Sequence, residues 1–106
     1  MDIMGMMKKA QAMQEKLQAA QDELGRLEVE GASGGGMVAI TLTAKGELKG
    51  VKIDPTLLVR DDKEMLEDLI VAAFADAKGK ADRLAAEKMQ ELTAGLPLPP
   101  GMKLPF

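Results

Sequence analysis

Apolar residues in the first part of the chain recur at alternating spacings of three and four. Spacing of this kind places one apolar seam along a helix and is typical of helices that pack against another helix. Polar and charged residues fill most positions between them, so the opposite face is hydrophilic. We therefore predict a long amphipathic helix that ends before Gly31. The seam consists of Ile3, Met6, Ala10, Met13, Leu17, Ala20, Leu24 and Leu27.

This helix is too long to be covered along its whole length by a small domain. At about 1.5 Å per residue it extends nearly 40 Å, so part of it must project or pair. Its methionines allow two interpretations: packing in a core or dimer contact, or a docking surface that adapts to irregular partners. Packing is favoured, because Met6 and Met13 both lie on the seam.

The middle of the chain changes to the alternating pattern of β-strands. Glycines between positions 31 and 36 favour a turn, and Val29 and Glu30 before them form a short first strand. Residues 37–43 alternate, with apolar side chains on one face. Lys45-Gly46 supplies a tight turn. A further strand over 48–54 then places Val51 and Ile53 inward and Lys49 outward.

A second long helix follows the hairpin. Asp61 and Glu64 have the spacing of a capping box at its start, and Gly95 and Pro97 stop it after about Thr93. Residues 96–106 form a proline-rich, extended tail. We predict an α+β fold with a single domain over 1–95. The apolar positions of the second helix are Leu66, Ile70, Phe74, Ala77, Ala81, Leu84 and Leu92.

A sheet of two or three strands is marginal on its own and leaves its edges exposed. Two copies related by a two-fold axis would bury these edges by joining their sheets. We therefore predict a homodimer.

Composition excludes most catalytic sites. The 106 residues include neither Cys nor His, which removes thiolate nucleophiles, zinc-finger ligands and imidazole acid–base chemistry. The glycine run is followed by a strand, whereas phosphate-binding loops lead into a helix. We predict no enzyme, no cofactor and no metal. Without a membrane-length apolar run or a signal peptide, the expected location is the cytoplasm.

The net charge of −3 requires any DNA-binding site to be local. In the second helix, acidic residues come first and basic residues later, as the helix dipole and pairs such as Lys78 with Asp82 and Arg83 with Glu87 would favour. The alternative interpretation is a positive surface that contacts phosphates. Composition does not decide between them. With few aromatic residues for stacking, any nucleic acid bound would be duplex, with weak sequence specificity.

Several segments, in this order and spacing, resemble the YbaB/EbfC family of bacterial nucleoid-associated proteins. The resemblance covers nearly the whole chain. It is carried by residues 7–14, 27–31, 35–38, 51–55, 65–77 and 100–102.

The resemblance implies a cytoplasmic, nucleoid-associated homodimer with joined sheets as its base and long helices projecting like tweezers around double-stranded DNA. It also implies a role in chromosome organisation, an effect on gene expression in some cases, and no catalytic activity. An alternative is an adaptor that binds proteins through the Met-rich helix and the tail. The family's DNA contacts are attributed to its helical arms, which gives the candidates Lys8, Lys9, Lys16, Lys78, Lys80, Arg83 and Lys88.

Overall fold

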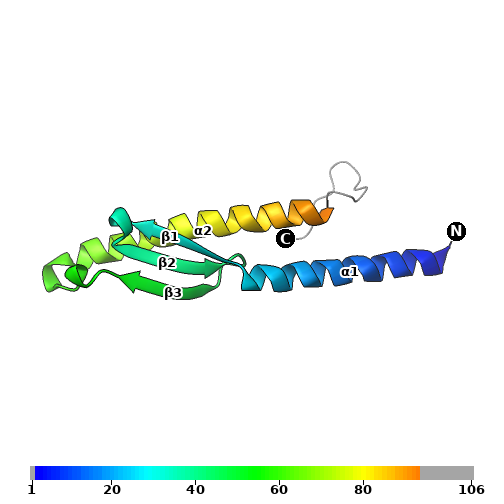
Figure 1. The fold of residues 1–106 in the computed structure, drawn as a ribbon, viewed down its shortest axis with the longest axis horizontal. Helices are drawn as coiled ribbons and strands as arrows, with labels where there is room; N and C mark the ends of the chain where they lie inside the picture. The colour runs from blue at the N-terminus through cyan, green and yellow to red at the C-terminus, as the bar shows by residue number, and fades with distance from the viewer. Residues whose placement is uncertain (1, 94–106) are drawn as a thin grey trace.

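The computed structural model describes residues 2–93, which form two long helices and one three-stranded sheet (Figure 1). The chain is elongated, with extents of 71 × 24 × 16 Å. This confirms the predicted α+β class, while the predicted tail over 96–106 lies outside the described residues. The order is α1 (Ile3–Arg26), β1 (Glu28–Ser33), β2 (Val38–Thr43), β3 (Leu48–Ile53) and α2 (Lys63–Thr93), with short 3-10 turns at Gly34–Gly36, Pro55–Leu57 and Arg60–Asp62.

The strands form an antiparallel meander in the order β1-β2-β3. α2 packs on one face of this sheet, over β1 and β2 (Figure 1). The apolar side chains of β2 point into this layer, where Val38, Ile40 and Leu42 are buried against Ala73 and Ala77 of α2. Small residues on α2 let the helix approach the sheet closely.

The seam of α1 is covered over only part of its length. Leu24 is its one fully buried residue, and it joins Ala44 and Met89 in a second small core. Ala20 of α1 and Leu92 of α2 are partly buried at the margin of that core. The rest of α1 extends past the end of α2 as a projecting arm (Figure 1). The prediction that part of this helix must project or pair is therefore confirmed.

The first strand and the start of the second helix differ from the sequence predictions. β1 runs over Glu28–Ser33 instead of two residues, because the whole segment pairs with β2, from Glu28 opposite Thr43 to Ser33 opposite Val38. The expected capping box does not form among the described residues. Asp61 lies inside a 3-10 turn that precedes α2, and its side chain makes no hydrogen bond there.

β3 also differs from expectation in its burial. Val51 pairs with Ile40 and so faces the same side of the sheet, as predicted, but its side chain stays 43% exposed. The reason is that α2 covers β1 and β2 and leaves β3 uncovered. Ile53, nearer the main core, is partly buried.

Candidate nucleic-acid interface

Three of the candidate lysines lie on the projecting arm. Lys8, Lys9 and Lys16 are all exposed on α1. Within residues 2–93 none of them forms an ion pair or a side-chain hydrogen bond. Their charges are therefore unneutralised by close partners and available to phosphates.

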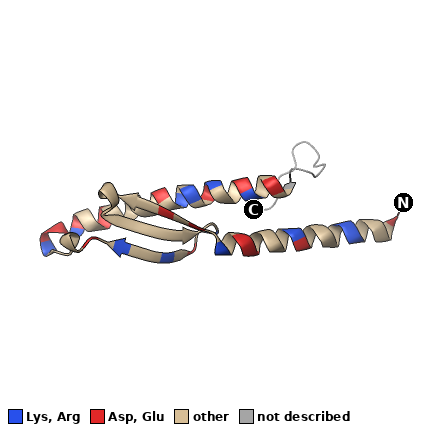
Figure 2. Ribbon diagram, in the orientation of Figure 1, with Lys and Arg blue, Asp and Glu red and all other residues tan. Residues whose placement is uncertain are grey.

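Helix geometry separates these three lysines into two directions. Lys9 and Lys16 are seven residues apart, which is nearly two turns, so they point to the same side of α1 about 10 Å apart along its axis. Lys8 points about 100° away from Lys9. Arm charges alternate with acidic residues along the ribbon (Figure 2). The positive feature of the arm is thus a narrow line and not a broad patch.

Lys88 of α2 lies on the same side of the molecule as this line. Its Nζ is 3.3 Å from Oε1 of Glu23, which follows Lys16 by seven residues, and 3.8 Å from Oε2 of Glu91. The hydrogen bond to Glu23, together with both negative charges, raises the pKa of Lys88. This pair ties α2 to α1 at the base of the arm, so part of the Lys88 charge is already neutralised.

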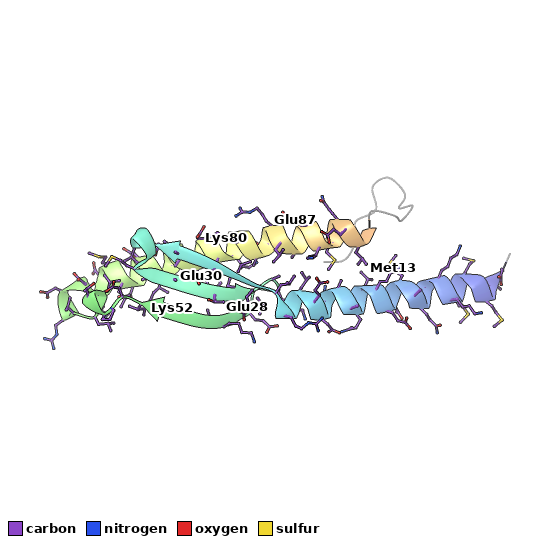
Figure 3. All side chains as sticks on the ribbon, viewed as in Figure 1. Met13, Glu28, Glu30, Lys52, Lys80 and Glu87 are labelled. Carbon is purple, nitrogen blue, oxygen red and sulfur yellow. The ribbon has the colours of Figure 1, made fainter. Side chains whose placement is uncertain are left out.

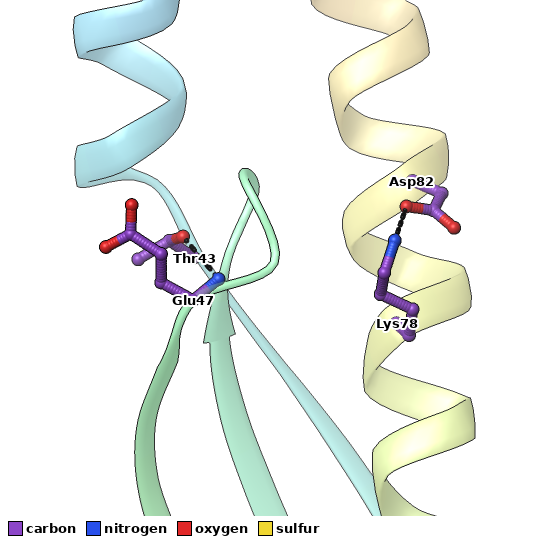
Figure 4. A network of polar contacts seen from close by, with 4 residues as sticks. All are labelled: Thr43, Glu47, Lys78 and Asp82. Carbon is purple, nitrogen blue, oxygen red and sulfur yellow. Dashed lines mark hydrogen bonds and ion pairs between the residues drawn. The ribbon is translucent and has the colours of Figure 1, made fainter.

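Lys78 is engaged in a pair within its own helix. It forms the predicted ion pair with Asp82, four residues later (Figure 4). The pair lies beside the β2–β3 turn, in which Thr43 accepts a hydrogen bond from the Glu47 N–H. The second expected pair does not form. Arg83 has no ion pair with Glu87 or with any other residue in the described part of the chain.

Lys80 has a structural role at the edge of the sheet. Its Nζ donates a 2.9 Å hydrogen bond to the carbonyl of Glu30 and lies 3.3 Å from Oδ2 of Asp76 (Figure 3). Asp76 in turn accepts a 3.0 Å hydrogen bond from the Ala32 N–H. That bond, followed by the one from Lys80, holds the pKa of the Asp76 carboxyl below its ordinary value. The two side chains thus cover outward-facing backbone groups of β1.

The structure does not bring the seven candidates together on one surface. Lys78 and Lys80 are two residues apart and point to different sides of α2. Lys80 and Arg83 lie on the side of β1, while Lys9, Lys16 and Lys88 follow the arm. The arm lysines are therefore the best-supported group, because they project and are unpaired. Sequence reasoning missed the bonds of Lys80 and Lys88, since their partners lie 50 and 65 residues away in the chain.

No helix within residues 2–93 is long and apolar enough to cross a membrane. A solved structure of an uncharacterised protein from Helicobacter pylori, HP0035, shares the fold with a TM-score of 0.76. The match covers 87% of this chain and 97% of that one at 23% sequence identity.

Sequence comparisons extend over the whole chain. A nucleoid-associated protein of Methylocella silvestris is 63% identical over 105 residues, which are 99% of this chain and 98% of the relative. The nucleoid-associated protein Atu0095 of Agrobacterium fabrum is 60% identical with the same coverage. The model of the YbaB/EbfC DNA-binding family matches residues 1–96. The chain therefore belongs to the YbaB/EbfC DNA-binding family, as its sequence segments predicted.

Proposed function

We propose that the protein is a nucleoid-associated homodimer that binds duplex DNA through its arms, with weak sequence specificity. The observation that carries this proposal is the line of unpaired cations, Lys9 and Lys16, on a helix that projects beyond the body of the fold. Lysines of this kind contact phosphates and do not read bases. Binding of this type organises chromosomal DNA and can alter gene expression. The names of the relatives support a location at the nucleoid.

The proposal is tested by mobility-shift titrations of the purified protein on two duplexes of unrelated sequence. Affinity falls steeply as salt rises, because binding releases counterions from the phosphates. The two duplexes bind with similar affinity, since backbone contacts carry no sequence information. Absence of a complex at low ionic strength, or a strong preference for one duplex, would contradict the proposal.

The homodimer is supported by a difference between the two edges of the sheet. On β1, Asp76 and Lys80 occupy the backbone groups of Ala32 and Glu30, which blocks the addition of a further strand. On β3, no side chain within residues 2–93 bonds to the outer backbone groups. The β3 edge is therefore the open one.

An exposed apolar strip accompanies this open edge. Leu48 and Val51 are exposed on the face of β3 that turns toward α2. Phe74 lies two residues before Asp76 and so points away from β1, toward β3, with Val71 one turn earlier. Pairing of β3 with the β3 of a second copy would make a six-stranded sheet and cover this strip. The arms of both copies would then belong to one dimer.

The substitution Val51→Glu is expected to convert the dimer into a monomer. It places a carboxylate in the strip, where burial without a partner is costly, and we expect dimer dissociation to rise at least about 100-fold. Mass by light scattering is the measurement. Val59→Glu makes the same change at an exposed valine outside this strip, in the segment that follows β3, and leaves the mass unchanged. A V51E protein that is folded by circular dichroism and still dimeric would contradict this interface.

A further inference from the structure

The outer half of α1 carries an apolar stripe that residues 2–93 leave exposed at Ile3, Met6 and Ala10 and cover only partly at Met13. We call Ile3, Met6, Ala10 and Met13 the arm stripe. Ile3 is 67% exposed and Met6 is 59% exposed, whereas Leu24 in the same seam is buried. One helix therefore has a single continuous seam, of which α2 covers only the inner part.

The inner part shows what kind of partner this seam accepts. Between Ala20 and Leu27 its side chains pack on apolar residues of another helix, Leu84, Met89 and Leu92 of α2. The arm stripe continues the same heptad spacing outward, and this spacing keeps a seam facing a partner helix. The described part of α2 ends at Thr93, alongside the middle of α1 (Figure 1). The element that would cover the remaining part of the seam is thus another helix.

We propose that the arm stripe packs antiparallel against the arm stripe of a second copy, joining arms of separate dimers. A second copy brings a seam of identical spacing. The antiparallel direction follows from the position of α2. If two arms ran parallel, both copies of α2 would crowd the same end of the contact, whereas antiparallel arms place each N-terminus near the end of the other copy's α2. Ala10 lies near the centre, where a small side chain allows close approach.

Charges beside the stripe partly balance each other in this contact. One flank of the seam carries Asp2, Lys9 and Lys16, so an antiparallel contact centred near Ala10 places Asp2 of each copy beside Lys16 of the other, with the two Lys9 side chains near each other. The opposite flank carries the uncharged Met7 and Gln14. Two attractive pairs and one repulsive pair of exposed charges largely offset each other, so salt changes arm association little. DNA binding falls steeply as salt rises, which keeps the two proposals separable.

The first test compares Met6→Gln with Met4→Gln. Both methionines are exposed, but two residues of helix place them on different sides of α1, and only Met6 belongs to the stripe. Methionine and glutamine have similar helix propensities, so both variants keep the helix. In sedimentation experiments without DNA, the wild type forms species larger than the dimer with rising concentration. We expect M6Q to weaken this association about tenfold and M4Q to leave it unchanged.

Equal association constants for all three proteins, or an equal loss in M4Q, would overturn the proposal. Because these measurements contain no DNA, their failure leaves the DNA-binding proposal standing.

A second test uses the absence of cysteine from the chain. Ala10→Cys introduces one thiol in the stripe, and Ala12→Cys introduces one on another side of the same exposed helix. With a short thiol-reactive crosslinker, A10C gives covalent pairs whose yield rises with protein concentration, and A12C does not. Equal yields would overturn the proposal. So would an A10C thiol that stays protected from reagent at every dilution, because an intramolecular cover such as residues 94–106 would then occupy the stripe.

Discussion

Reversing the charge of Lys9 and Lys16 to glutamate lowers the affinity for duplex DNA by at least about 100-fold at low salt. Both lysines are exposed, unpaired and on one side of the arm. Each lysine that contacts a phosphate contributes roughly one unit to the salt slope, so the slope falls by about two units per protomer. Mobility shifts at several salt concentrations measure both quantities.

The control for this variant makes the same change of charge elsewhere. Arg60→Glu with Lys63→Glu alters two exposed cations at the end of the fold opposite to the arm of the same protomer. This double variant reduces the affinity for DNA only through the net charge of the protein, so the salt slope of its DNA binding stays near that of the wild type. If the two double variants lost affinity equally, the arm line would not be the binding surface. Adding Lys8→Glu to the arm pair then shows whether the other side of the helix contributes.

The helices and strands of this chain follow from local sequence patterns, which explains why most of them could be predicted. The seam spacing gave α1, and the alternation of Val38, Ile40 and Leu42 gave β2. Burial depends on which elements meet, and local patterns do not contain that information. Val51 has the correct orientation but stays exposed, because the width of a single helix covers two strands and not three.

The roles of the candidate site residues also divide into those that local sequence patterns indicate and those that depend on the fold. The arm lysines were identifiable because they sit between seam positions on a helix long enough to project. The roles of Lys80 and Lys88 were not, since each depends on a contact between elements distant in the chain. A lysine that clamps β1 and a lysine that binds phosphate look alike in sequence. Only the fold shows that Lys80 reaches the carbonyl of Glu30.

Replacement of Gly31 by alanine is expected to cost at least about 3 kcal/mol of unfolding free energy, at the upper end for overpacking a core. Gly31 is buried in β1 where α2 crosses it. A Cβ there would lie 2.2 Å from the Ala77 nitrogen and 2.6 Å from the Ala73 carbonyl oxygen. These are backbone atoms of a helix, so no side-chain rotation relieves the clash. The helix must move off the sheet, which opens the core around Ile40 and Leu42.

Urea denaturation followed by circular dichroism measures this loss of unfolding free energy. A Gly31→Ala protein that shows no cooperative unfolding transition also agrees with the prediction. Gly50→Ala is the matched control, because Gly50 is also a strand glycine but has no atom within 4 Å of the position that an alanine methyl would take. Its unfolding free energy changes by no more than about 0.5 kcal/mol. A G31A protein within about 1 kcal/mol of the wild type would show that α2 does not need this close approach to β1.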